Sequence, residues 1–245
     1  MNFAGRHVLV TGAGRDTGRK LALAFAARGA QVLATARTQS AAEETVALIR
    51  AAGGTATAAV LDLADPTSID QLPVDRLDIL VNSGARYLGP EATPEDITDT
   101  IAGAATGTVL LTERLLPLLR ASDHPDIVNL ISAAGEVGHH RSDAHPAFYA
   151  AKHAQAGYAE ILSARLRPEG IRVISLFPPD FAQDGSRDAD STLTAQSVID
   201  CVLFAVSQPR DCFIRAFHFE QVTTQAQRPR PHSSAWSSVL SASDG

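Results

Sequence analysis

Residues 11–18 form a glycine-rich turn that could bind the phosphates of a nucleotide. The turn follows an apolar stretch and opens a helical pattern, and it consists of Thr11, Gly12, Ala13, Gly14, Arg15, Asp16, Thr17 and Gly18. Glycines without side chains let backbone amides and the start of a helix approach a pyrophosphate closely. The sequence therefore predicts a phosphate site between the first strand and the first helix.

Phe148 and Lys152 are a second pair whose spacing matters for chemistry. Residues four apart lie on the same face of a helix, so both side chains should face one site. Lys20 and Lys152 are the only lysines, and arginine fills the other 19 of the 21 Lys and Arg positions. The Lys152 stem could simply line the helix surface, and the Phe148 ring has no ionisable proton to transfer.

Apolar, β-branched runs alternate with longer helical patterns along the chain. The predicted strands are His7–Val10, Val32–Thr35, Thr57–Leu61, Ile79–Val81, Ile127–Ile131, Val173–Phe177 and Cys212–Phe217. The predicted helices are Gly18–Ala27, Ala41–Ala51, Pro94–Arg120, Phe148–Arg167 and Ala195–Val206. The alternation predicts an α/β fold, a Rossmann-like doubly wound parallel β-sheet of about seven strands with helices on both faces.

Local signals give the expected boundaries of these elements. Ser40 with Glu43 has the spacing of a capping box, and Gly29, Gly53 and Gly170 stand where helices should end. We expect a single domain over residues 1–221. Residues 222–245 are rich in Ser, Pro and Arg and predict a flexible tail.

Composition and charge exclude several classes of protein. The net charge of −6 comes from mixed acidic and basic residues, without the basic stripe that a nucleic-acid partner requires. No apolar run approaches the roughly 20 residues that span a bilayer. Cys201 and Cys212 lack the paired spacing of a zinc site, so no metal is expected. The first residues enter a strand without a charged leader, and we expect a cytoplasmic protein.

Taken together, these motifs resemble the short-chain dehydrogenase/reductase family over residues 5–220. Asp62 follows the third predicted strand, where family members contact adenine. Residues 82–85 (Asn-Ser-Gly-Ala) stand where the family has NNAG, and residues 132–135 (Ser-Ala-Ala-Gly) match its catalytic serine segment. The resemblance implies a dinucleotide site formed by Gly12, Gly14, Arg15, Asp16, Thr17, Gly18, Arg37, Asp62, Leu63, Asn82, Gly84, Lys152 and Pro178.

The resemblance also favours NADP(H) over NAD. Arg15 and Arg37 match positions at which family members hold the 2′-phosphate of NADP(H). An acidic residue at the end of the second strand would instead favour NAD through the ribose hydroxyls. The alternative is that both arginines are solvated surface residues.

Asp16 puts this cofactor site in question, because it replaces the second glycine of the family pattern TGxxxGxG. A carboxylate about 6 Å from a phosphate charge costs on the order of 3 kcal/mol at an effective dielectric constant near 20. That corresponds to a roughly hundredfold loss of affinity. The carboxylate could turn away to pair with Arg15 or Arg19, which leaves a working site. It could instead cap the first helix and occupy the anion site itself.

The catalytic residues of the family are only partly present. Ser132 and Lys152 match, but Phe148 replaces the tyrosine that exchanges a proton with the substrate, and the tetrad asparagine aligns near Ala104. Tyr149 is rotated by about 100° from Phe148 and would need a helix bulge to enter the site. The expected tetrad is therefore degenerate.

Histidines in the segment between Ser132 and Phe148 are candidate replacement acids. His140 and His145 fall where family members border the substrate pocket, and histidine transfers protons near neutral pH. The alternative is that they are solvated surface residues.

Three functions remain open. We expect an NADP(H)-binding oxidoreductase with atypical reduction of a small-molecule carbonyl or enone. The alternatives are a non-redox biosynthetic enzyme, such as a cyclase, isomerase or dehydratase, and a catalytically silent subunit. The family resemblance implies a homodimer or homotetramer, or a hetero-oligomer with an active paralogue, and residues 180–194 as a mobile substrate lid.

Overall fold

Seven parallel strands form one sheet in the computed structural model, which describes residues 1–139, 142–187 and 192–221. The strands are β1 (His7–Val10), β2 (Gln31–Ala36), β3 (Thr55–Val60), β4 (Ile79–Asn82), β5 (Asp126–Leu130), β6 (Arg172–Phe177) and β7 (Ala216–His218). Their order in the sheet is β3-β2-β1-β4-β5-β6-β7, so the chain reverses its winding direction between β1 and β4. The predicted doubly wound sheet is confirmed.

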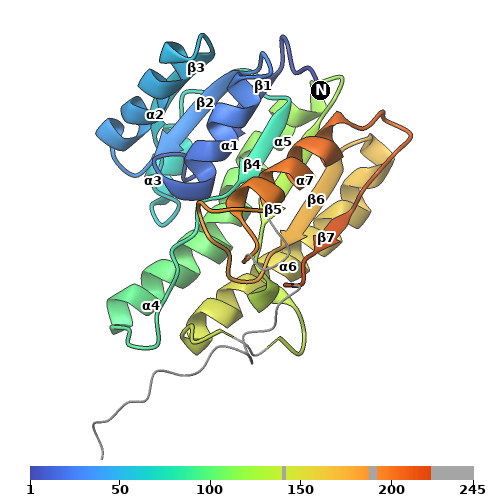
Figure 1. Ribbon diagram of the computed structural model, residues 1–245. Helices are drawn as coiled ribbons and strands as arrows, with labels where there is room; N and C mark the ends of the chain where they lie inside the picture. Colours follow the sequence, from blue (N-terminus) through green and yellow to red (C-terminus); the bar gives the residue numbers. More distant parts are fainter. Residues whose placement is uncertain (140–141, 188–191, 222–245) are drawn as a thin grey trace, which may run out of the picture.

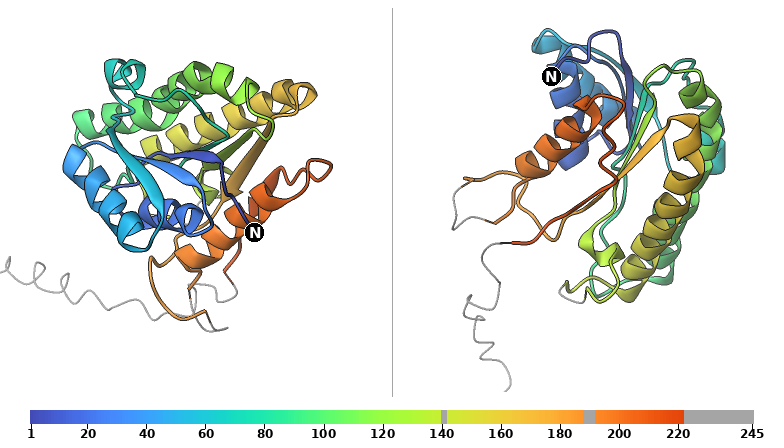
Figure 2. Two further views of the ribbon diagram at one scale, coloured as in Figure 1. Left: turned by 90° about the horizontal axis from the view of Figure 1, so that it is seen from above. Right: turned by 90° about the vertical axis from the view of Figure 1, so that its right-hand side faces the viewer.

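Helices cover both faces of this sheet (Figures 1 and 2). One face carries α1 (Asp16–Ala26), α2 (Gln39–Ala51) and α7 (Ala195–Ser207). The other face carries α3 (Pro66–Asp70), α5 (Thr108–Arg120) and α6 (Pro146–Leu166). Helix α4 (Pro94–Ile101) packs beside the first turns of α6, at the end of the molecule where the strands finish (Figure 1).

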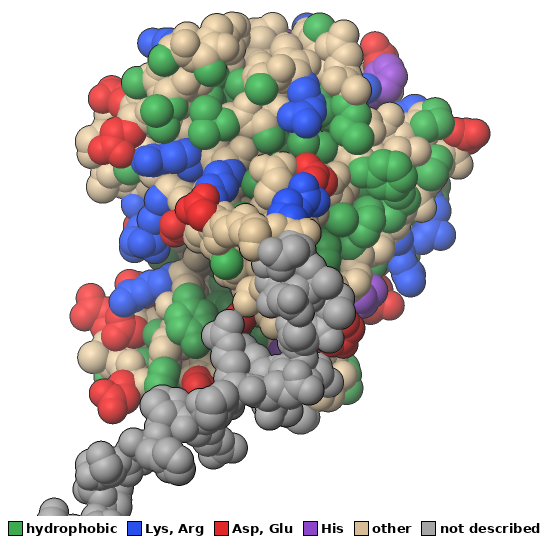
Figure 3. All heavy atoms as spheres, viewed as in Figure 1, with side chains coloured by type: hydrophobic (Ala, Val, Ile, Leu, Met, Phe, Trp, Pro, Cys, Tyr) green, Lys and Arg blue, Asp and Glu red, His purple; other side chains and the backbone are tan. Residues whose placement is uncertain are grey.

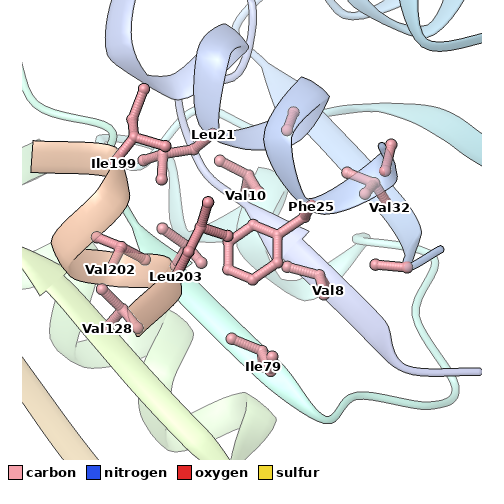
Figure 4. Packing of buried hydrophobic residues seen from close by; sticks show 14 of the residues in the cluster. Val8, Val10, Leu21, Phe25, Val32, Ile79, Val128, Ile199, Val202 and Leu203 are labelled. Carbon is pink, nitrogen blue, oxygen red and sulfur yellow. The ribbon is translucent and has the colours of Figure 1, made fainter. Parts of the chain in front are cut away.

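The core consists of two apolar layers, one on each face of the sheet. In the first layer the ring of Phe25 from α1 lies among Val8, Ile79 and Leu203 (Figure 4). The central strands β1 and β4 are apolar and buried on both faces, as parallel strands between helices must be. This rigid frame fixes the loops at the carboxyl ends of the strands.

The predicted helix ends are confirmed, but the capping box is wrong. Gly29, Gly53 and Gly170 have φ values of 90°, 81° and 75°, in the left-handed region that glycine adopts readily. Ser40 lies inside α2. Thr38 is its N-cap, because its backbone is still extended and its hydroxyl accepts a hydrogen bond from the Ala41 amide.

Three other predictions need correction. The helix expected over residues 94–120 is divided into α4, a π-helical turn η1 (Ala102–Gly107) and α5. The last strand is shorter than the expected Cys212–Phe217, because the Cys212 carbonyl accepts a hydrogen bond from Arg172 within a turn. Helix α3 was not expected. The predicted tail over residues 222–245 lies outside the described residues.

Candidate functional site

A cavity of about 770 Å³ opens at the carboxyl ends of the central strands, where doubly wound folds bind ligands. Figure 3 shows a hollow between the main body and the lobe that carries α4, with Lys and Arg side chains along its upper side. The predicted site residues that line the cavity are Gly12, Gly14, Arg15, Asp16, Thr17, Gly18, Arg37, Asp62, Leu63, Gly84, Ala104, Ser132, Phe148, Lys152 and Pro178.

The glycine-rich turn packs so closely that side chains would not fit. A Cβ atom at Gly12 would lie 2.8 Å from the Gly84 Cα, and one at Gly18 would lie 2.3 Å from the Gly12 carbonyl oxygen. Arg15 is the N-cap of α1 and makes no side-chain capping hydrogen bond. The start of α1 is therefore open to an anion, as binding of a pyrophosphate requires.

Asp16 is turned away from the start of the helix. Its backbone has a φ of 48°, a conformation that suits glycine better, and its carboxylate lies 3.4 Å from the Arg15 Nε. The Asp16 side chain is 56% exposed. Arg19 is engaged elsewhere, with Glu44 and the Gly14 carbonyl. Of the two arrangements considered from the sequence, the structure has the one in which Asp16 pairs with Arg15.

The chemical end of the cavity contains Ser132 and Phe148. Ser132 has a strained φ of 132°, a backbone conformation that often marks a functional site. Its Oγ accepts a hydrogen bond from the Ala134 amide, 3.1 Å away. The Phe148 ring is buried against Leu88 and Ala134.

Lys152 is buried beside the Phe148 ring and lines the same cavity as Ser132. It is only 3% exposed, and its Nζ donates to the Gln155 Oε1 at 2.9 Å and to the Leu130 carbonyl at 3.5 Å. The Nζ also lies 5.6 Å from the centre of the Phe148 ring. No carboxylate of the described residues forms an ion pair with it. Burial lowers the pKa of Lys152 from 10.5 to about 7.

Comparison with known proteins identifies the family. A model of the family described as short chain dehydrogenase matches residues 6–193. This chain belongs to the short-chain dehydrogenase family. A relative named as an uncharacterized oxidoreductase, from Thermotoga maritima, is 35% identical over 192 residues, which cover 76% of this chain and 75% of that protein.

Solved structures agree with this assignment. A metagenomic short-chain oxidoreductase in complex with NADP is 26% identical, with a TM-score of 0.74 over 87% of this chain and 96% of that one. The angucycline C-6 ketoreductase LanV with bound NADP is 25% identical, with a TM-score of 0.74 over 88% of this chain and 94% of that one.

On α6 of this short-chain dehydrogenase, the residue four positions before Lys152 is Phe148, which has no hydroxyl. The Tyr149 hydroxyl donates to the Ser142 carbonyl at 3.0 Å and accepts from the Ser142 amide at 3.2 Å. Tyr149 is not among the residues that line the cavity. The helix bulge lies instead in η1, where Ala104 borders the cavity with a methyl group that cannot relay a proton.

The candidate histidines have different positions in this short-chain dehydrogenase. The His145 Nδ1 accepts a hydrogen bond from the Ala147 amide, so His145 is the N-cap of α6 and lies outside the cavity lining. His140 lies outside the described residues. His139, the residue before His140, lines the cavity.

Other site residues differ from the expectation or were missed. The Asn82 side chain lies within the sheet, where its Nδ2 donates to the Asn129 Oδ1 at 2.9 Å, and it does not line the cavity. Tyr87 was missed. Its ring contacts Phe148 edge-on, with a centroid distance of 5.4 Å, and it borders the cavity. Only its position after the fourth strand could have indicated this role.

The start of the expected lid is attached to α1. The Gln183 side-chain amide donates to the Thr17 hydroxyl at 3.1 Å, and the Lys20 ammonium lies 2.6 Å from the Asp184 carboxylate. Gln183 also lines the cavity. This segment is thus tied to the helix whose start would receive the pyrophosphate.

No group of three or more His, Cys, Asp or Glu side chains in the described ranges could hold a metal ion. Among the same residues, none of the helices has the length and apolar character to cross a membrane.

Proposed function

We propose that this short-chain dehydrogenase is an NADP(H)-dependent reductase of a small-molecule carbonyl or enone, with a proton source other than a tyrosine on α6. The observation that carries the proposal is the orientation of Asp16. Its carboxylate pairs with Arg15 and leaves the start of α1 uncapped, so the glycine turn still fits a pyrophosphate.

The preference for NADP(H) rests on two arginines at the nucleotide end of the cavity. Arg37 directly follows β2 and Arg15 lies in the glycine turn; both border the cavity. Guanidinium groups bind phosphate through several hydrogen bonds, and β2 ends without an acidic residue that would favour a ribose 2′-hydroxyl. Two structural neighbours of this chain hold NADP.

The dinucleotide, when bound, supplies the hydride. The Ser132 hydroxyl can then donate a hydrogen bond to the substrate oxygen. Lys152 can donate hydrogen bonds to the hydroxyls of the nicotinamide ribose. The rings of Phe148 and Tyr87 pack edge-to-face and form an aromatic part of the cavity wall. His139 and solvent are the proton sources that this arrangement offers.

The test is transfer of deuterium from NADPH labelled at C4 to a panel of small ketones, aldehydes and enones. The proposal expects deuterium in at least one product, with the rate reduced at least tenfold by Ser132→Ala. Conversion of a panel member without consumption of NADPH would favour the non-redox enzyme. Binding of NADPH without deuterium transfer to any panel member would favour the silent subunit.

A further inference from the structure

The environment of Lys152 differs from that of an ordinary lysine. Its amine is buried, with two uncharged hydrogen-bond acceptors, Gln155 Oε1 and the Leu130 carbonyl, and the Phe148 ring beside it. A buried ammonium without a counter-charge is costly, so this setting favours the neutral amine. A neutral amine is a nucleophile, whereas an ammonium is not.

The amine is also within reach of a small molecule, because Lys152 lines the cavity together with Ser132, Phe148 and Tyr87. The ionisable side chains that share this cavity are Arg15, Asp16, Arg37, Asp62, Arg86, Tyr87, Asp99, His139 and Asp180. On α6 itself and on the elements packed against it, the other titratable groups are Glu95, Asp96, Glu113, Arg114, Arg120, Asp126, Tyr149, His153, Tyr158, Glu160, Arg165, Arg167, Glu169 and Arg172. The lowered pKa of Lys152 has burial as its cause, and none of these groups.

We propose that Lys152 is a covalent, imine-forming site for small aldehydes and ketones, an activity separate from hydride transfer. The Lys152 nitrogen lone pair forms a C–N bond to the carbonyl carbon as the C=O π bond breaks, and one proton moves from the nitrogen to the carbonyl oxygen, which gives a carbinolamine. The C–O bond then breaks, and the hydroxyl leaves as water with the second N–H proton, which gives the imine. The step needs no oxidant or reductant, and the Ser132 hydroxyl can polarise the carbonyl oxygen in the first stage.

Phe148 contributes to the site because its side chain has no hydroxyl that could accept a hydrogen bond from Lys152. A phenol at this position would accept a hydrogen bond from the Lys152 ammonium and favour the charged form. The phenyl ring contributes only a weaker attraction at its face. The substitution that removes the usual proton donor therefore leaves a more nucleophilic amine.

Reductive trapping tests the site on the full chain without nucleotide. The protein is incubated with butanal and cyanoborohydride at pH 7.5, and adducts are located by peptide mass spectrometry. We expect Lys152 to be modified at least tenfold faster than Lys20, whose ammonium is paired with Asp184. Adducts confined to Lys20 and the amino terminus of a folded protein would overturn the proposal.

Matched variants and pH complete the test. Lys152→Arg should lose the internal adduct, and Lys20→Arg should keep it. With a pKa near 7 the Lys152 amine is already neutral at pH 8 and pH 9. Its trapping rate, normalised for reagent, should change less than twofold from pH 8 to pH 9, whereas Nα-acetyllysine gains about tenfold in its neutral form over the same range. A parallel tenfold rise for Lys152 would contradict the proposal.

Phe148→Tyr should slow the trapping of Lys152 at least threefold. An unchanged or faster rate in this variant would contradict the role given to the phenyl ring. Because this experiment contains no NADPH, its failure leaves the proposed reductase activity untouched, and the deuterium experiment decides that activity separately.

Discussion

Phe148 places a buried ring where a phenol would otherwise reach the reacting atoms. The ring packs against Leu88 and Ala134, and the cavity beside it also holds Ser132 and Lys152. A hydroxyl added to this ring would lie near the Lys152 amine. That hydroxyl would favour the ammonium form of Lys152, and a nearby ammonium lowers the pKa of a tyrosine, so the new phenol would be a competent acid.

Phe148→Tyr should therefore raise kcat/KM for carbonyl reduction by about tenfold or more, since general acids contribute roughly 10²- to 10⁴-fold. The measurement is the rate of NADPH oxidation with a ketone substrate. Tyr149→Phe is the control, because Tyr149 does not line the cavity and its hydroxyl is bound to the Ser142 backbone, and it should change the rate less than twofold. An unchanged or lower rate in Phe148→Tyr would count against this reading of the site.

Asp16 is the residue at which the proposed cofactor site can be tested by substitution. Asp16→Gly removes a negative charge near the phosphates and allows the left-handed φ of 48° without strain. Because the side chain is 56% exposed and paired with Arg15, solvent screens much of the repulsion. We expect the Kd for NADPH to fall about three- to tenfold by fluorescence titration.

Asp16→Asn separates the two contributions, because it removes the charge and retains a side chain that tolerates this backbone. An equal increase in NADPH affinity in Asp16→Gly and Asp16→Asn would show that the negative charge of Asp16 weakens binding. Weaker binding of NADPH by Asp16→Gly would mean that the carboxylate assists the cofactor, contrary to the proposal.

At the level of elements, the π-helical turn η1 connects α4 to α5 and positions Ala104 beside the cavity. Gly107 ends this turn in contact with the backbone after β3. A Cβ atom there would lie 1.9 Å from the Leu63 carbonyl oxygen, a contact that the backbone cannot relieve without moving. Gly107 therefore allows the π-helical turn to pack directly on Leu63, which lines the cavity.

Gly107→Ala should lower the free energy of unfolding by about 3 kcal/mol, as overpacking against rigid backbone does. Gly157→Ala is the matched control, since Gly157 is exposed within α6 and a Cβ atom there meets nothing within 4 Å. It should raise stability by about 0.5–1 kcal/mol. Urea unfolding measures the free energy of unfolding of both variants. Equal changes in Gly107→Ala and Gly157→Ala would contradict the packing described for η1.

The sequence predicts most elements because hydrophobic periodicity is a local property. The six strands from β1 to β6 and the left-handed glycines at the helix ends follow directly from it. The π-helical turn could not be predicted, since it depends on contact between Gly107 and Leu63. The length of β7 depends likewise on Arg172, which binds the Cys212 carbonyl 40 residues away.

At the scale of the whole molecule, a buried ionic cluster joins residues 206–212, at and after the end of α7, to the sheet. Asp126 is fully buried in β5 and accepts hydrogen bonds from Arg172 and Arg210, each at 2.8 Å. Arg172 also donates to the backbone carbonyl of Val206 in the last turn of α7 and to that of Cys212 between α7 and β7. The cluster thus joins β5, β6 and the connection that follows α7.

Asp126→Asn should lower the free energy of unfolding by about 3 kcal/mol, because it leaves the buried Arg172 guanidinium without a counter-charge. Equilibrium unfolding in urea measures the change. The exposed pair Arg120–Glu169 is the control: Glu169→Gln should cost far less, because surface ion pairs contribute little. Similar losses from both variants would contradict the role of the cluster.

The positions of the site residues were predictable where the glycine turn, Asp62, Ser132 and Lys152 follow strands in a fixed order. The directions in which the site side chains point could not be predicted from the sequence. Whether Asp16 caps α1 or pairs with Arg15, and whether Tyr149 enters the cavity, depends on tertiary contacts. Tyr87 borders the cavity through a loop whose path no local pattern specifies.

The most direct test of the central claim is a fluorescence titration of the unaltered protein with NADPH and, in parallel, with NADH. The open start of α1 and the arginines at positions 15 and 37 predict a Kd for NADPH in the micromolar range and binding of NADH at least tenfold weaker. Absence of binding by either dinucleotide at millimolar concentration would contradict the claim that this member of the family retains its cofactor site.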